Sequence, residues 1–124
     1  MQKLTELGVS RIVPFVAERS VVKWDPDKAR RNVERLRKVA REAAMQSRQV
    51  VLPRVDDLQS SLASAVSLVG HVSLAEPGGA ELDTSVVAVA VGPEGGLTDS
   101  ELDGRPTVSL PGGILRTETA AVVA

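Results

Sequence analysis

The segment 86–96 constrains the fold of this chain more than any other stretch of its sequence. It begins with six consecutive apolar residues, 86–91, four of which are valine. A short, uninterrupted apolar run rich in valine is typical of a strand that is buried on both faces, as in a parallel sheet. Because parallel strands need covering layers of helices, this run predicts an α/β fold.

The residues that follow the run predict a ligand-binding loop. Pro93 has no amide hydrogen and ends the strand, and the glycines at 95 and 96 let another molecule approach the bare backbone. The spacing of Thr98 and Glu101 is that of a capping box, which predicts the start of a helix. In α/β proteins, ligands bind in such loops at the carboxyl ends of strands. The loop has neither the Walker lysine nor the three-glycine Rossmann spacing.

Composition narrows the classes of site that this chain can hold. With 124 residues it is long enough for one α/β domain, 1–124. Phe15 and Trp24 are its only aromatic residues, which excludes an aromatic stacking platform for single-stranded nucleic acid. There is no cysteine and one histidine, His71, so no metal site is predicted. No stretch has the length and apolarity of a membrane span, and no signal peptide is recognisable, so we expect a cytoplasmic protein.

Helical and strand patterns alternate along the chain, which favours a parallel α/β sheet flanked by helices. Helices are predicted over 2–7, after the Asp25-Pro26 cap, after Asp56 as a cap, and over 115–124. Strands are predicted over 11–16, 50–53, 71–75, 86–91 and 107–110, with the fourth at the centre.

Three of the predicted strands end in loops rich in proline and glycine, at 76–79, 92–96 and 110–113. If the strands are parallel neighbours, these loops share one edge of the sheet. Loops without bulky side chains present amide and carbonyl groups, which can hold an adenine without charged residues. The alternative is ordinary turn chemistry.

Positive charge is concentrated in the first part of the chain. Residues 1–48 carry twelve Lys and Arg against six Asp and Glu, whereas residues 49–124 carry three against ten. The helix after Asp25 has an apolar stripe and seven cations, Lys28, Arg30, Arg31, Arg35, Arg37, Lys38 and Arg41. This asymmetry favours contact with the phosphates of an RNA, against the alternative of a solvated surface. The predicted RNA-binding residues are Arg30, Arg31, Arg35, Lys38 and Arg48.

Several ordered motifs together resemble the SPOUT class of methyltransferases, and more closely the 16S ribosomal-RNA uridine-N3 methyltransferases of the RsmE type. The motifs are Gly92-Pro93-Glu94-Gly95-Gly96, then Leu110 with Ile114-Leu115-Arg116-Thr117-Glu118-Thr119-Ala120, and earlier Lys3-Leu4-Thr5-Glu6-Leu7-Gly8-Val9, Arg19-Ser20 and Glu42-Ala43-Ala44-Met45-Gln46-Ser47. The match covers nearly the whole chain in the family's order.

The resemblance implies a parallel sheet whose carboxyl-terminal part forms a deep trefoil knot, a homodimer, and S-adenosylmethionine as cofactor. The implied cofactor-binding residues are Val91, Gly92, Pro93, Glu94, Gly95, Gly96, Leu110, Pro111, Gly112, Ile114, Leu115 and Thr119. It also implies a substrate in the 16S ribosomal RNA of the small subunit. Alternatives are ribose 2′-O methylation by another SPOUT enzyme, or a dimerising RNA-binding fragment without catalysis.

Methylation at N3 requires that the uracil imide lose its proton. An arginine can stabilise the resulting negative charge and a carboxylate can accept the proton. The candidates are Arg116 with Glu118, and Glu6 with Gln46. The alternatives are a helix-end ion pair for the first pair and bonds to buried backbone groups for the second.

The chain also departs from the family's pattern. Pro111 and Gly113 stand where the family usually has glycine and arginine, and Gln49 stands where it usually has arginine, although Arg48 lies next to it. The family's amino-terminal β-barrel domain, its first catalytic strand and most of its last helix have no counterpart here, so we expect a fragment of a longer protein.

Overall fold

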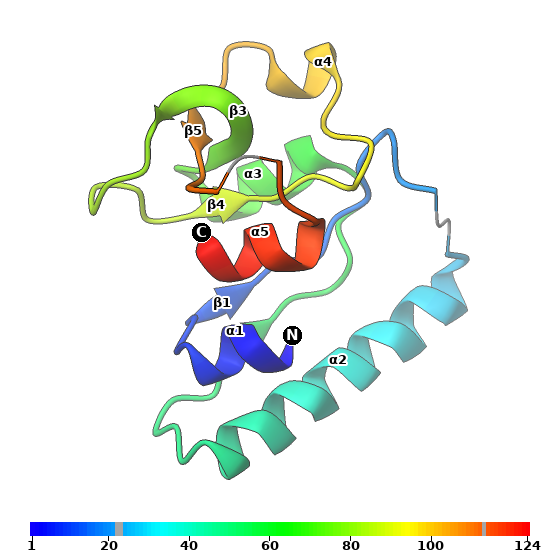
Figure 1. The fold of residues 1–124 in the computed structure, drawn as a ribbon. Helices are drawn as coiled ribbons and strands as arrows, with labels where there is room; N and C mark the ends of the chain where they lie inside the picture. Colours follow the sequence, from blue (N-terminus) through cyan, green and yellow to red (C-terminus); the bar gives the residue numbers. More distant parts are fainter. Residues whose placement is uncertain (22–23, 113) are drawn as a thin grey trace. The chain divides into compact units, whose positions relative to one another are not determined.

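A computed structural model describes residues 1–21, 24–112 and 114–124 (Figure 1). Its helices are α1 Gln2–Glu6, α2 Pro26–Gln46, α3 Leu62–Val69, α4 Asp99–Leu102 and α5 Thr117–Val123. Its strands are β1 Arg11–Ile12, β2 Arg54–Val55, β3 Ser73–Glu81, β4 Val89–Ala90 and β5 Thr107–Ser109. The strands pair in parallel, which confirms the predicted α/β class. None of the described helices has the length and apolarity needed to cross a membrane.

The chain forms two compact units. The first unit contains residues 1–16 and 24–60, and therefore α1, α2, β1 and β2. The second contains residues 17–21 and 61–124, and therefore all the later elements. The short segment 17–21 thus belongs with residues that lie far beyond it in the sequence.

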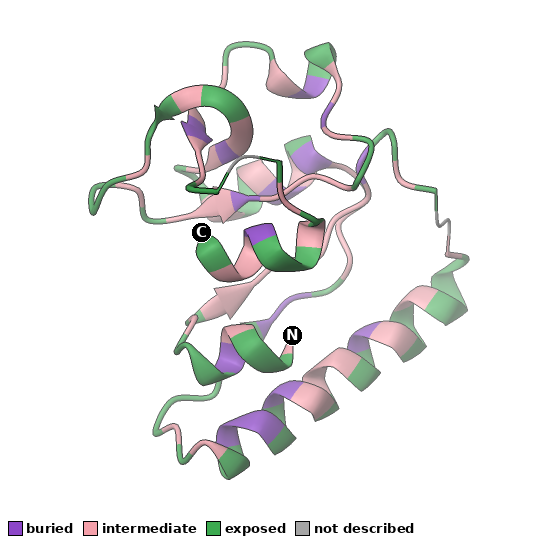
Figure 2. Cartoon of the chain, in the orientation of Figure 1, coloured by how far each residue is buried: buried purple, intermediate pink, exposed green. Residues whose placement is uncertain are grey.

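The first unit is organised by α2, its longest helix (Figure 1). As predicted, Asp25 caps this helix: its carboxylate accepts a hydrogen bond from the Lys28 amide at 2.8 Å, and Pro26 occupies the first turn. That amide holds the pKa of Asp25 below its ordinary value. Buried residues line one side of the helix, Val33, Ala40, Ala43 and Ala44 (Figure 2).

The strands of the first unit are shorter than predicted, and one lies elsewhere. Only Arg11–Ile12 of the predicted strand 11–16 is β1, with an isolated bridge at Phe15. The prediction of a strand at 50–53 is wrong, because β2 begins after Pro53 and the Val50 side chain is 98% exposed. Proline cannot donate to a strand ladder, and the first such bond runs from the Arg54 amide to the Ser10 carbonyl at 2.9 Å.

Asp56 does not cap a helix, contrary to the prediction. α3 begins later, where the hydroxyl of Ser61 accepts a bond from the Ser64 amide at 3.1 Å. Asp56 is instead buried, at 7% exposure, and its two oxygens accept from Arg11 Nε at 2.6 Å and Arg54 Nε at 2.9 Å. The bond from Arg11 holds the pKa of Asp56 below its ordinary value.

This carboxylate should make the first unit sensitive to acid. Because its folded pKa is lowered, its contribution is complete above the unfolded pKa of about 3.9 and is lost as the pH falls through the folded pKa. We expect Asp56→Asn to cost about 2 kcal/mol at pH 7, the scale of hydrogen bonds to a charged group. Urea unfolding at pH 7 and pH 3 measures this, with the exposed Asp103→Asn as control. A cost that is equal at both pH values would contradict the assignment.

The sheet of the second unit has the strand order β4-β3-β5. β3 is its central strand and continues through Pro77, Gly78 and Gly79, so the prediction that a strand over 71–75 ends in a loop at 76–79 is wrong. Both Ala75 and Ala80 pair with Val108, which means that residues 76–79 bulge out between them. Pro77 is tolerated because a bulged residue makes no ladder bond.

β4 is shorter and less buried than its apolar run predicts. It covers only Val89–Ala90, lies at the edge of the described sheet, and is preceded by Val87, which is 81% exposed. The predicted strand 86–91, central and buried on both faces, is therefore wrong in length and position. The run is apolar as expected, but only Val89 and Ala90 of it pair with β3, at Ser73 and Leu74.

The remaining elements of the second unit confirm the sequence analysis. β5 and α5 lie within the predicted ranges 107–110 and 115–124. Thr98 caps α4, and the full capping box with Glu101 is present. Among the described residues, the core of this unit is aliphatic and consists of Ala17, Leu62, Ala65, Leu74, Ala90, Leu97, Val108 and Ala120.

Candidate functional site

The glycine loop, residues 91–97, leaves the carboxyl end of β4 and leads into α4. Its turn is closed by a bond from the Gly96 amide to the Pro93 carbonyl at 2.8 Å, and Gly96 has a φ of +70°. A Cβ on Gly92 would lie 3.0 Å from Cγ of the buried Leu97. The loop is thus a tight turn with its backbone drawn against the core, which only small residues permit.

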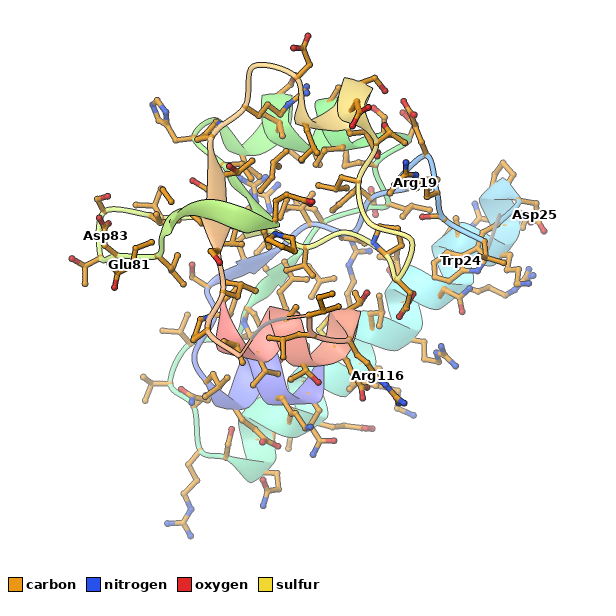
Figure 3. All side chains as sticks on the ribbon, turned by 45° about the horizontal axis from the view of Figure 1, so that its top comes forward. Arg19, Trp24, Asp25, Glu81, Asp83 and Arg116 are labelled. Carbon is orange, nitrogen blue, oxygen red and sulfur yellow. The ribbon has the colours of Figure 1, made fainter. Side chains whose placement is uncertain are left out.

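The loop is held by two side chains from distant parts of the chain. The Thr117 hydroxyl, at the start of α5, donates to the Gly92 carbonyl at 3.0 Å. Arg19 Nη1 donates to the carbonyls of Gly95 and Leu97 at 2.9 and 3.2 Å, and Arg19 lies beside this loop in Figure 3. In the sequence, Thr117 and Arg19 stand within longer motifs, and no local pattern indicates these bonds.

The second predicted loop, 110–115, adjoins a hollow in the same unit. The hollow has a volume of about 450 Å³ and is lined by Gly79, Glu81, Leu82, Ser109, Leu110 and Pro111. Its lining brings Gly79, the last bulged residue of β3, next to the end of β5. The predicted shared edge is met only in part, because residues 76–79 lie within β3 and not at its end. Gly112 has a φ of +100°. Gly113 lies outside the described residues.

The predicted residues around α5 are near the surface. Arg116 is the N-cap residue of α5 and is exposed (Figure 3). Glu118 and Thr119 are exposed as well. Within the described part of the chain, Arg116 and Glu118 form no ion pair, so the helix-end pair considered as an alternative is not formed. Ile114, predicted to bind cofactor, is 94% exposed.

The other predicted catalytic pair, Glu6 and Gln46, lies in the first unit. Both residues are exposed, so neither serves a buried backbone group as the alternative supposed. The Glu6 carboxylate accepts from Gln2 Nε2 at 3.0 Å, and its carbonyl accepts from Gln49 Nε2 at 2.8 Å. The side chain of Gln49 therefore joins the end of α2 to α1. Next to it, Arg48 has a φ of +55°.

The cations of α2 divide into structural and solvent-facing groups. Arg37 is structural: Nε and Nη2 both donate to the Val55 carbonyl at 3.0 Å, and Nη2 also contacts Asp57. The solvent-facing cations are Lys28, Arg30, Arg31, Arg35, Lys38 and Arg41. Two of them form ion pairs in the described part of the helix, Arg30 with Asp27 at 2.8 Å and Lys38 with Glu42 at 3.8 Å.

The fold and the candidate site together define a class of protein: an α/β protein with parallel strands and a glycine loop at the carboxyl end of one strand. The family model of the RNA methyltransferase domain matches residues 1–124, and the chain belongs to this family. It is 36% identical to Ribosomal RNA small subunit methyltransferase E of Bacillus subtilis, covering 100% of this chain and 57% of that protein. It is 34% identical to the protein of the same name from Mycobacterium bovis, covering 97% and 53%.

Solved structures agree with this assignment. Ribosomal RNA small subunit methyltransferase E from Neisseria gonorrhoeae, crystallised with S-adenosyl methionine, is 28% identical and superposes with a TM-score of 0.85 over 98% of this chain and 55% of that one. The present chain therefore spans about half the length of the curated relatives that it matches.

Proposed function

We propose that this chain is the S-adenosylmethionine-dependent catalytic domain of an enzyme that methylates N3 of a uridine in 16S ribosomal RNA. The observation that carries the proposal is the glycine loop, which α5 ties down through Thr117 in the same compact unit as the Leu110–Pro111 hollow. Membership of the RNA methyltransferase family and the ligand named in the Neisseria structure support it.

The donor set of the second unit fits this cofactor. Loops without bulky side chains offer amides and carbonyls to an adenine, and the hollow of about 450 Å³ has the size of a small-molecule site. Glu81, the one charged residue among the described lining residues, suits a ligand that carries a sulfonium and an ammonium group. The residues proposed to hold the cofactor are those of 91–96 and 110–115, with Thr119.

S-adenosylmethionine supplies a methyl group on a sulfonium, which is already a good leaving group. The chain's own task is then alignment and charge stabilisation. In our proposal Arg116 stabilises the negative charge on the uracil imide, and Glu118 accepts its proton. Both side chains are exposed and unpaired with each other, so they are accessible to an RNA base. Glu6 and Gln46 are proposed to assist on the substrate side.

The same proposal covers the wider properties of the domain. We propose that residues 1–124 form a single SPOUT domain with a carboxyl-terminal trefoil knot and act as a homodimer. Its substrate would be the RNA of the small ribosomal subunit in the cytoplasm, held in part through Arg30, Arg31, Arg35, Lys38 and Arg48. The solvent-facing position of these five side chains supports this role.

Calorimetric titration with S-adenosylmethionine tests the proposal. We expect micromolar binding, and we expect Gly95→Val to weaken it at least about tenfold, the cost of one misplaced group at a binding site. Valine would crowd Arg19, since a Cβ at this position lies 3.3 Å from the Arg19 Cβ, and would cover the backbone. Ser67→Val, exposed on α3, is the control.

The outcomes separate the candidate functions. Absence of binding by the unaltered chain would favour an RNA-binding fragment without catalysis. Full affinity in a folded Gly95→Val variant would contradict the location of the site. Methylation of a ribose hydroxyl instead of a base would contradict the proposed chemistry while leaving the cofactor site intact.

A further inference from the structure

We infer that Ala17–Val21 is a clamp segment that fixes the glycine loop in its binding conformation, with Arg19 as a positioning residue. The inference rests on the proposed function for its consequence, the affinity for cofactor. The contacts that carry it are independent of that function. They join residues about eighty positions apart in the sequence and lie entirely within the second unit.

The first contact is made by the guanidinium of Arg19. A single nitrogen, Nη1, bonds two loop carbonyls, those of Gly95 and Leu97, which are separated by one residue. The Gly95 carbonyl lies in the peptide plane before Gly96 and the Leu97 carbonyl in the plane after Leu97, so the two bonds restrain the backbone on both sides of the Gly96–Leu97 pair, which includes the residue with positive φ. A charged donor makes such bonds stronger than a neutral one does.

The second contact is made by Glu18, on the neighbouring residue. Its carboxylate accepts from the hydroxyls of Thr98 at 2.8 Å and Ser100 at 3.0 Å, and its amide donates to buried Glu101 at 3.0 Å. Thr98 and Glu101 are the two members of the capping box at the start of α4. The clamp segment therefore bonds the second half of the loop through Arg19, and the start of α4, which follows the loop, through Glu18.

The clamp segment is itself held by internal hydrogen bonds. Ala17 is buried, its amide donates to the Ser20 hydroxyl at 3.1 Å, and its carbonyl accepts from the Ser20 amide at 3.0 Å. These two bonds close a turn that directs Glu18 and Arg19 toward the loop.

The physical consequence is preorganisation of the glycine loop. Glycines lose more backbone entropy on ordering than other residues, and a loop with Gly92, Gly95 and Gly96 would incur that cost when a ligand binds. In a loop already fixed by Arg19 and Glu18, this backbone entropy is lost on folding and not on binding. Cofactor affinity should therefore depend on side chains that need not touch the cofactor.

Amide hydrogen exchange tests the clamp without any ligand. In Arg19→Ala we expect the amide of Gly96 to exchange about tenfold faster, because local opening of its turn becomes easier. The matched control is Arg37→Ala, which also removes an arginine from a backbone carbonyl, that of Val55, but in the first unit. Unchanged protection of Gly96 in Arg19→Ala would overturn the inference, whatever the chain binds.

Calorimetry with S-adenosylmethionine tests the consequence. We expect Arg19→Ala to lower affinity about tenfold, the effect of losing roughly 1.4 kcal/mol, while its melting temperature falls no more than that of Arg37→Ala. Arg19→Lys, which can still donate to one carbonyl, should recover part of the affinity. Equal affinity in Arg19→Ala and the unaltered chain would refute the positioning role. No binding by the unaltered chain would refute the proposed function instead, and exchange at Gly96 would still decide on the clamp.

Discussion

Gly79→Ala is expected to destabilise the second unit by about 3 kcal/mol, at the upper end of the usual cost of overpacking a core. A Cβ at this position would lie 2.7 Å from the Thr107 carbonyl carbon and 2.7 Å from the Val108 amide nitrogen. Both are backbone atoms of β5, so no side-chain rotation relieves the overlap. The central strand β3 would have to separate from β5, where Val108 is part of the core.

The neighbouring glycine supplies the control for this experiment. A Cβ on Gly78 meets nothing within 4 Å, and only its φ of +84° opposes substitution. We expect Gly78→Ala to cost about 1 kcal/mol, the strain of one residue in the left-handed region. Urea unfolding, followed by circular dichroism, measures both. If the two variants are equally stable, the close approach of β3 and β5 at Gly79 is not a feature of the protein in solution.

The elements that could be predicted from sequence are those whose evidence is local. The Asp25-Pro26 cap and the Thr98–Glu101 capping box each depend on residues within one helical turn, and both were confirmed. Strand limits depend on pairing partners far along the chain. Thus the apolar residues Val50 and Val51 resemble a strand but are exposed, because the ladder with β1 begins only at Arg54.

The candidate site divides in the same way. The glycine loop was identified because a strand, a proline and glycines occur in sequence order, and the structure places them in one turn. The hydrogen bonds that hold the loop could not be predicted from sequence, because Thr117 bonds a carbonyl 25 positions away and Arg19 bonds one 76 positions away. Asp56 was misassigned for a related reason: an aspartate before a helix is a plausible cap until a distant arginine, here Arg11, provides a better partner.

Reversal of two charges on α2, Arg31→Glu with Arg35→Glu, is expected to lower affinity for ribosomal RNA at least about tenfold at moderate salt. Lys28, Arg31, Arg35 and Lys38 follow one another at intervals of three and four residues, so they form one stripe. This stripe lies opposite the buried face that includes Val33 and Ala40. It is therefore a row of cations directed away from the core of its unit.

The salt dependence of binding distinguishes phosphate contacts from a general effect of charge. Each neutralised phosphate releases about one counterion, so the loss of two contacts should reduce the slope of log affinity against log salt by about two. Binding to small ribosomal subunits is measured at several salt concentrations.

Lys3→Glu, an exposed reversal on α1 of the same unit, is the control and should change the slope little. Titration with S-adenosylmethionine should be unaffected, because the proposed cofactor loops belong to the second unit. If the double reversal leaves affinity and slope unaltered, α2 is a solvated surface, and RNA recognition must lie elsewhere.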